Sequence, residues 1–365
     1  MSVNLDHAST SPLSKSVLGR LDELYAIYYN PSAAYEVGAY NMEIIENVRE
    51  KVAKSINAEP EEIIFTSSGS EANALAIDGY IKANLDINNQ ILVYCSEIEH
   101  TSILKNPNIN GFIKVNSDGI IEISEENING SLISCQMCNN EIGTYQPIKY
   151  FSDIIHKNNG IIHCDCTQAY GKVPIDVKYL DIDMASFSGH KIGSVRGVGF
   201  LYVKKGIKID PIIYGEQENG LRGGTYNDFA IKTLGLAIDD IDYKENDVLR
   251  ARRNFLVNKL FEIEGVHVNG GMIDRSASNI NIRIDNISID SQQLVALLDD
   301  AGFLVSAGSA CHSGDLTPSH VLKAIGLTDK EARSSIRITI GIENSVRELE
   351  DFVNALNIII NMYRN

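Results

Sequence analysis

The feature that most constrains the fold is an alternation of short apolar runs with segments of helical periodicity. Helical periodicity covers residues 14–28 and 33–56. The apolar runs typical of strands follow at residues 63–65, 91–94, 132–134, 161–163, 184–187 and 198–203. Such alternation predicts βαβ units in an α/β fold, with a mostly parallel sheet sandwiched by helices.

The pattern changes after about Asn246. We predict an amphipathic helix over residues 248–264 and strands at 280–284 and 336–340. The capping box from Ser345 to Glu348 then opens a final helix. We therefore expect a large domain at 14–245 and a smaller α+β domain formed by residues 1–13 plus 246–365.

Composition and charge exclude several classes of protein. The 365 residues are 44% hydrophobic and 22% charged, as in ordinary globular chains. The net charge of -16 argues against binding to nucleic acid or anionic membranes, because both need Lys and Arg to meet phosphate. The first residues contain no basic region followed by an apolar stretch, and no apolar run approaches the length of a membrane span. We expect a cytoplasmic protein.

Six cysteines in a chain of this length do not indicate a disulfide scaffold. Cys135 and Cys138 have the CxxC spacing of a metal or redox site, and Cys164 and Cys166 add two thiols. Both pairs end apolar runs typical of buried strands, where Cys packs as a small hydrophobic residue. Burial is the stronger interpretation, although a metal site stays open.

A lysine and an aspartate follow two of the predicted strands. Lys191 comes after the run from Met184 to Phe187, and Asp165 ends the run that begins at Ile161. Ligands of parallel sheets bind at the carboxyl ends of the strands, so both side chains are expected at one edge. A lysine paired with a carboxylate is what a pyridoxal phosphate enzyme needs: the lysine forms a Schiff base and the carboxylate keeps the pyridine nitrogen protonated.

Other polar residues follow predicted strands and could complete such a site. The segment from Thr66 to Asn73 is a small-residue turn that opens a helix, where backbone N-H groups could bind an anion. A simple Ser-rich helix cap explains the segment equally well. His100 could stack on a cofactor ring and move protons, although a single histidine is more often structural.

The chain resembles the cysteine desulfurases of the NifS/IscS type, which are class V aminotransferases with the type I fold of pyridoxal phosphate enzymes. The resemblance runs nearly from end to end. Its ordered motifs are Leu5-Asp6-His7-Ala8-Ser9-Thr10-Ser11-Pro12, Asn30-Pro31-Ser32, Asn139-Asn140-Glu141-Ile142-Gly143, Ser186-Phe187-Ser188-Gly189-His190-Lys191, Arg222-Gly223-Gly224-Thr225 and Ser334-Ser335-Ile336-Arg337.

The resemblance implies a role for each matching residue. Lys191 would be the Schiff-base lysine, Asp165 the pyridinium partner and His100 the ring-stacking acid and base. The other implied contacts are Gln168 and Asn140 to the ring oxygen, Gly69, Ser70, Ser188 and His190 to the phosphate, Thr225 from the other subunit of a homodimer, and Arg337 with Asn30 to the substrate.

Among the class V aminotransferases, the segment from Val305 to Gly314 resembles that of the cysteine desulfurases in particular. Cys311 lies there among Gly, Ser and Ala residues, in a loop that suits a nucleophile which enters the site and leaves it. The resembled reaction converts L-cysteine to L-alanine and leaves the sulfur on Cys311 as a persulfide. A sulfur acceptor protein, either a scaffold or a carrier, would then receive it for iron-sulfur cluster or thio-cofactor assembly.

Some features depart from the family pattern. Gly193-Ser194-Val195-Arg196-Gly197 replaces the usual Gly-Pro-Lys-Gly or Gly-Pro-Arg-Gly turn, and Cys166 replaces the usual Ala, which is expected to place a second thiol next to the cofactor. The chain also ends soon after Arg337, which leaves the acceptor open. Alternatives are a selenocysteine lyase, another class V aminotransferase, or a noncatalytic sulfur carrier or metal-binding protein.

Overall fold

The computed structural model describes residues 2–85, 91–123, 128–308 and 317–364. Its largest element is a seven-stranded sheet in the order β2-β8-β7-β6-β5-β3-β4. The bounds of these strands are β2 Ile63–Thr66, β3 Val93–Ser96, β4 Gly111–Ile113, β5 Leu132–Gln136, β6 Ile161–Asp165, β7 Met184–Ser188 and β8 Gly199–Val203.

Most neighbours in this sheet are parallel, as predicted. The pairs β3-β4, β3-β5, β5-β6 and β6-β7 are parallel, whereas β8 is antiparallel to both β7 and β2. Only about ten residues connect β7 to β8, which is too short for the crossover that parallel strands require. The α/β fold with a mainly parallel sheet is confirmed.

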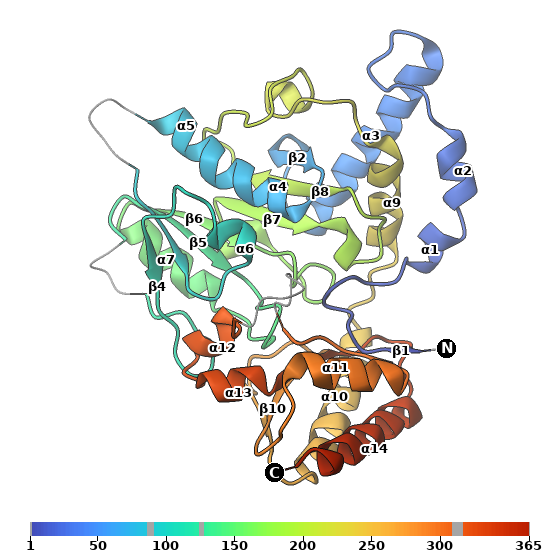
Figure 1. Ribbon diagram of the computed structural model, residues 1–365. Coiled ribbons are helices and arrows are strands. Elements are labelled where there is room, and N and C mark those ends of the chain that lie inside the picture. Colours follow the sequence, from blue (N-terminus) through green and yellow to red (C-terminus); the bar gives the residue numbers. More distant parts are fainter. Residues whose placement is uncertain (1, 86–90, 124–127, 309–316, 365) are drawn as a thin grey trace.

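Helices cover both faces of the sheet (Figure 1). Alternate strand residues point to opposite faces, so Phe65, Phe187 and Phe200 join one core cluster while Ile64 and Leu201 join another. The first face is covered by α3 Glu36–Ser55, α7 Ile148–Lys157 and α9 Asp228–Asp239. The second face is covered by α4 Gly69–Ala74, the π-helical turn η2 Leu75–Gly79 and α6 Thr101–Leu104.

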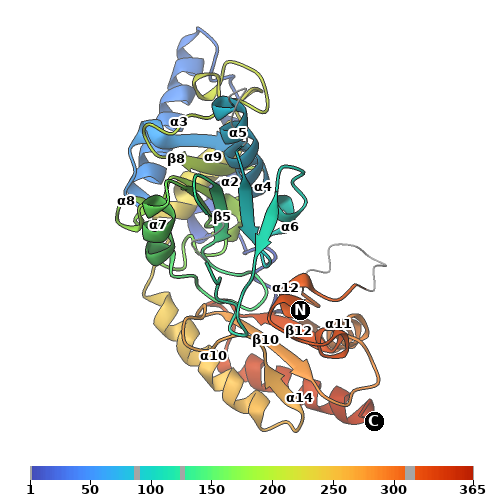
Figure 2. The ribbon, with the colours of Figure 1, turned by 90° about the vertical axis from the view of Figure 1, so that its left-hand side faces the viewer.

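The C-terminal part builds a core of its own, below the large sheet in Figures 1 and 2. A three-stranded antiparallel sheet of β9 Val266–Val268, β10 Asn279–Ile284 and β12 Ser335–Thr339 packs with α10 Glu245–Phe261, α11 Ser291–Asp300 and α14 Val346–Met362. Near the N-terminus, β1 Val3–Asn4 pairs with β11 Phe303–Leu304, and Leu5 lies in this second core. These cores support the proposed division into domains 14–245 and 1–13 plus 246–365.

The remaining helices are short. They are α1 Lys15–Leu18, α2 Leu21–Ala26, η1 Pro60–Glu62, α5 Tyr80–Asn84, α8 Val177–Leu180, η4 Gly189–Lys191, η5 Glu218–Gly220, α12 His320–Ala324 and α13 Asp329–Arg333. The single helix predicted over residues 14–28 is wrong, because Gly19 ends α1 and the backbone of Arg20 leaves the helical region. The predicted capping box is confirmed, with Ser345 and Glu348 at the start of α14. Within the described ranges, no helix has the length and apolar character needed to cross a lipid bilayer.

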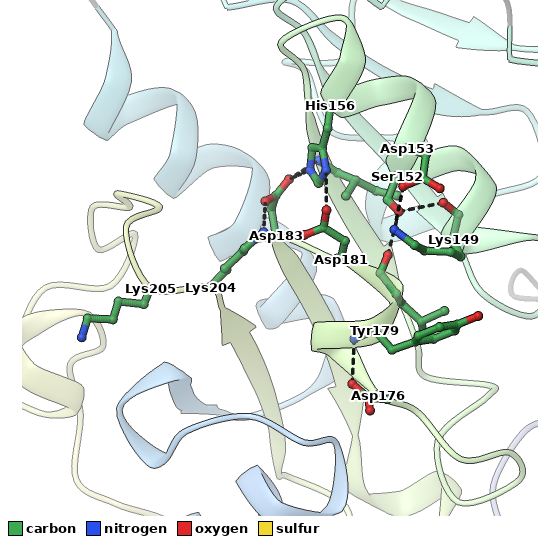
Figure 3. Close-up of polar contacts among 12 residues, drawn as sticks. Lys149, Ser152, Asp153, His156, Asp176, Tyr179, Asp181, Asp183, Lys204 and Lys205 are labelled. Atoms are coloured by element: carbon green, nitrogen blue, oxygen red, sulfur yellow. Dashed lines mark hydrogen bonds and ion pairs between the residues drawn. The ribbon is translucent and has the colours of Figure 1, made fainter.

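A polar cluster lies at the edge of the sheet where β6 and β7 begin, opposite their carboxyl ends (Figure 3). His156, at the end of α7, lies 3.1 Å from Asp181 and 2.7 Å from Asp183. Asp183 is buried and also accepts the main-chain N-H of Ile162, while Lys204 pairs with Asp181 at 2.6 Å. The cluster therefore joins α7 to the starts of β6 and β7 and to the end of β8.

We predict that His156→Ala destabilises the fold by about 1–3 kcal/mol, because it leaves the buried Asp183 carboxylate short of a hydrogen-bond donor. Urea unfolding measures the change. His267→Ala is the matched control, since His267 forms a single pair with Asp285 in which both side chains are exposed, and such pairs contribute less than about 1 kcal/mol. Equal losses in the two variants would contradict the role of the buried cluster.

Candidate active site

The carboxyl ends of three neighbouring strands form one wall of a cavity. Gln136 of β5 is in register with Asp165 of β6, which is in register with Ser186 of β7. The cavity has a volume of about 430 Å³. The predicted residues that line it are Gly69, Ser70, His100, Asn140, Asp165, Gln168, Ser188, His190, Lys191 and Arg337. The structure thus brings together ten of the predicted residues from distant parts of the sequence.

Lys191 ends the short turn η4 that follows β7. Its Nζ atom donates to the main-chain oxygens of Ala8 at 2.6 Å and Ser9 at 2.8 Å. Burial, followed by the nearby charges of Lys172 and Arg337, lowers the pKa of the Lys191 amine to about 7. A substantial fraction of this amine is therefore neutral, and so nucleophilic, near neutral pH.

Asp165 is a buried carboxylate with two defined hydrogen-bond donors. Asn73 Nδ2 donates to Oδ2 at 2.9 Å, and the main-chain N-H of Thr167 donates to Oδ1 at 2.9 Å. These bonds fix the orientation of the carboxylate at the cavity wall. Sequence reasoning gave Asn73 no role, because only the packing of α4 beside the strand ends brings it to Asp165.

Gly69, the first residue of α4, lies at the cavity wall. A Cβ atom added to Gly69 would lie 2.8 Å from Thr167 Oγ1, so only glycine fits there. Thr167 Oγ1 is buried and has no hydrogen-bond partner in the described structure. Ser68 caps α4 by accepting from the N-H of Glu71, so the helix-cap interpretation also holds. Beside this helix cap, the Thr167 hydroxyl remains without a hydrogen-bond partner among the described residues.

Two histidines line the cavity in different settings. His100 caps α6, and its Nδ1 atom lies 2.8 Å from Ser102 Oγ. Burial lowers the pKa values of both His100 and His190, the latter to about 4. Both imidazoles are therefore mainly neutral near pH 7. His190 Nδ1 lies 3.1 Å from Thr10 Oγ1 of the N-terminal segment.

Glu99, next to His100 in the sequence, was missed by sequence reasoning. It is fully buried at the cavity wall, and burial raises its pKa to about 8. Its Oε1 atom accepts the main-chain N-H of Gln136 at 2.8 Å, whereas Oε2 has no partner among the described residues. The carboxyl group of Glu99 is therefore largely neutral near pH 7.

Arg337 of β12 enters the cavity from the C-terminal part of the chain. Its guanidinium pairs with Asp6 at 2.7 Å and donates to Ser9 Oγ at 2.9 Å and to the main-chain oxygen of Asn140 at 3.1 Å. The buried Nε atom has no partner in the described structure. A buried guanidinium with an unused donor suits recognition of a carboxylate.

The N-terminal segment is the largest part of the site that the sequence did not predict. Residues Ala8 and Ser9 hold Lys191, and Ser11 donates to the main-chain oxygen of Lys191. The motif from Leu5 to Pro12 marked this segment in the sequence. Nothing in the spacing of the motif indicated that it contacts Lys191, more than 180 residues further along the chain. These long-range bonds join the N-terminal segment to the turn after β7 at the site.

Two predicted residues that the structure describes, Asn30 and Thr225, are not in the cavity wall of this single chain. Asn30 accepts the N-H of Ser32 in an exposed turn, and Thr225 lines a separate hollow with Arg222. Cys311 lies outside the described residues. Their roles stay predictions.

The expectation that Cys166 places a thiol next to the cofactor is wrong. Cys166 lies in the buried core and is not part of the cavity wall, because it follows Asp165 and points to the other side. Cys138 contributes a buried thiol to the wall instead. The predicted burial is confirmed for Cys135, Cys138, Cys164 and Cys166, and Cys95, for which nothing was predicted, is buried as well. Within the described ranges no group of three or more His, Cys, Asp or Glu side chains could hold a metal ion.

Comparison with known proteins gives a consistent result. The family model "Aminotransferase class-V" matches residues 3–352. The cysteine desulfurase IscS of Methanosarcina thermophila is 36% identical to this chain, and the alignment of 383 residues covers 100% of this chain and 93% of the relative. The cysteine desulfurase IscS 1 of Archaeoglobus fulgidus is also 36% identical, and that alignment covers 99% of this chain and 97% of the relative. The crystal structure of a NifS-like protein from Rickettsia africae is 31% identical and superposes with a TM-score of 0.89, covering 99% of this chain and 100% of that one. The chain therefore belongs to the class V aminotransferase family and, within it, to the IscS/NifS-like cysteine desulfurases.

Proposed function

We propose that this protein is a pyridoxal phosphate-dependent cysteine desulfurase that converts L-cysteine to L-alanine. The sulfur would be carried as a persulfide on Cys311 and passed to an acceptor protein, a scaffold or a carrier, for iron-sulfur cluster or thio-cofactor assembly. The observation that carries this proposal is the meeting of Lys191, Asp165 and Arg337 in one cavity of a chain that matches IscS proteins over its full length.

The residues of the cavity fit pyridoxal phosphate. The cofactor supplies an electron sink for the carbon atoms of an amino acid attached to it. Lys191 would hold it covalently, Asp165 would face its ring nitrogen and His100 would stack on the ring. The proposed phosphate contacts are Gly69, Ser70, Ser188 and His190, together with the unsatisfied hydroxyl of Thr167; Gln168 and Asn140 would contact the ring oxygen.

Arg337 would bind the carboxylate of the substrate. Its free Nε donor is available, and the Asp6 carboxylate that now faces its NH2 group shows that an anion fits there. The lowered pKa of Lys191 lets its amine take up and release a proton near neutral pH, as acid-base chemistry on the substrate requires. These two residues would thus orient the amino acid and move its protons.

The proposed role of Cys311 rests on its sequence context. Ser306 and Gly308, which lead toward it, line the cavity. The Cys311 thiolate would attack the substrate sulfur, forming an S-S bond while the substrate C-S bond breaks. The electron pair of the broken bond stays with the carbon, which takes up a proton and leaves as part of alanine.

We also propose a homodimer. Exposed aromatic side chains gather on α2, the connection after it and the start of α3, including Tyr25, Tyr28, Tyr35 and Tyr40. Asn30 lies in the same stretch of chain, so a second copy packed here would bring it and the Thr225 loop toward a neighbouring subunit. Clustered exposed apolar surface of this kind is typical of protein interfaces.

We predict a dimer that stays intact on dilution to nanomolar concentration, because obligate interfaces are large and partly apolar. Sedimentation velocity across a dilution series measures the mass. Fully active monomers would exclude the proposal that Asn30 and Thr225 act across an interface.

Activity is tested with purified protein, L-cysteine and a reductant. We expect equal amounts of alanine and sulfide from the wild type. Lys191→Ala should abolish both products and the borohydride-reducible attachment of the cofactor, because no other lysine among the described residues lines the cavity. A covalent cofactor adduct that survives in Lys191→Ala would remove this lysine from its role. L-Selenocysteine in the same assay distinguishes a selenocysteine lyase.

We predict that Cys311→Ser keeps cofactor binding and the fold but lowers sulfide release to background. A hydroxyl near pH 7 is a far weaker nucleophile than a thiol with a few per cent thiolate. Tandem mass spectrometry after incubation with L-cysteine should locate the persulfide on Cys311.

Cys138→Ser is the matched control, because Cys138 lines the cavity but burial raises its pKa to about 11. This variant should keep its turnover. A persulfide found on Cys138 in the wild type would show that the central residue of the mechanism is misassigned.

A further inference from the structure

A second lysine, Lys172, lies next to the site but is not part of the cavity wall. It belongs to the helical turns that follow β6, seven residues beyond Asp165. Its side chain is half-buried, and desolvation lowers its pKa. Among the described residues no carboxylate forms an ion pair with it; its ammonium donates instead to Gln168 Oε1 at 3.0 Å. A half-buried ammonium group without a carboxylate partner is partly desolvated, so its position requires an explanation.

A continuous path of hydrogen bonds leads from Lys172 to Lys191. Gln168 accepts from Lys172 through Oε1, which fixes its amide so that Nε2 faces the other way. Nε2 donates to the main-chain oxygen of Ala8 at 3.1 Å. The same oxygen accepts from Lys191 Nζ at 2.6 Å. We propose that Lys172 is a positioning residue for Lys191, acting through the Gln168 amide and the main chain of Ala8; this inference rests on the proposed function, in which Lys191 holds the cofactor.

The charges around Lys191 support this role. After burial, Lys172 is the largest cause of the lowered pKa of Lys191, ahead of Arg337. Asp6 and Asp165 act in the opposite direction, yet the pKa remains at about 7. Asp6 is also engaged by Arg337 at 2.7 Å. The positive charge of Lys172 thus opposes the effect of the Asp6 and Asp165 carboxylates on the pKa of Lys191.

Three other titratable side chains at the cavity, His100, His190 and Glu99, add little charge of their own. Burial lowers the pKa values of His100 and His190, so both rings are mainly neutral at pH 7, and burial raises the pKa of Glu99, which is largely protonated. The positive field at Lys191 therefore comes from Lys172 and Arg337. Arg337 faces the proposed substrate site, whereas Lys172 lies outside the cavity, which leaves Lys172 free to act on Lys191 with or without substrate.

The experiment compares Lys172→Met with Lys172→Arg in the cofactor-loaded protein. Methionine keeps the length of the side chain but removes both the charge and the donor to Gln168, whereas arginine keeps both. The first readout is the pH at which the visible absorbance of the lysine-cofactor linkage titrates. The second is the pKa of Lys191 in cofactor-free protein, measured by trace acetylation and peptide mass spectrometry.

We expect Lys172→Met to raise both values by about 0.5–1 pH unit, because a neighbouring positive charge has been removed. Lys172→Arg should restore most of the wild-type titration. Lys149→Met is the control, since Lys149 is exposed and pairs with Asp153 on α7, far from the site; it should titrate as the wild type.

A second variant separates position from charge. Gln168→Leu keeps Lys172 but breaks the path to Ala8. Because Gln168 is also a proposed contact to the ring oxygen, this variant is studied in cofactor-free protein, where we expect the rate of Lys191 acetylation to change with a smaller change in its pKa. Acetylation at the wild-type rate would overturn the path through Gln168.

The outcomes distinguish this inference from the proposed function. If wild-type protein forms no reducible adduct at Lys191, the proposed function fails. If the adduct forms in the wild type and Lys172→Met, folded as judged by circular dichroism, titrates at the wild-type pH, Lys172 has no role toward Lys191.

Discussion

The site depends on the parallel register of three strands. Because β5, β6 and β7 run in the same direction, Gln136, Asp165 and Ser186 fall in one row at the carboxyl edge of the sheet. The turn after β7 then returns Lys191 to the same edge. A one-residue slip of β6 would turn Asp165 away and bring Cys166 to the cavity. The alternation of side chains along these buried strands therefore determines which residues line the cavity as well as which residues form the core.

Closure of the cavity depends on segments that are far apart in the sequence. Asp6 and Ser9 bind Arg337 of β12, and Ala8 binds Lys191. The N-terminal segment therefore connects Arg337 of β12 to Lys191, which follows β7. A substrate carboxylate at Arg337 would compete with Asp6, so binding there and the position of this segment are physically linked.

The sequence predicted what depends on local pattern. Asp165 and Lys191 each follow an apolar run, and strand ends of a parallel sheet share an edge, so their meeting could be expected before the structure was known. Asn73, Glu99 and Lys172 could not be found this way, because their contacts depend on side-chain packing between elements. The antiparallel direction of β8 did leave a signal, since the stretch between residues 188 and 198 is too short for a crossover helix. The break at Gly19 was also visible, but helical periodicity on both sides concealed it.

Burial also separates the cysteines by reactivity. The five described thiols are all buried, and burial raises the pKa values of Cys95, Cys138 and Cys164. A buried thiol with a raised pKa remains protonated near neutral pH and reacts slowly with sulfur electrophiles. Cys138 shows the consequence most clearly, because it lines the cavity and still lacks the thiolate that attack on a substrate requires. Under the proposed function the nucleophile is therefore expected from another segment, and Cys311 stands in a stretch of small residues that follows Gly308 at the cavity wall.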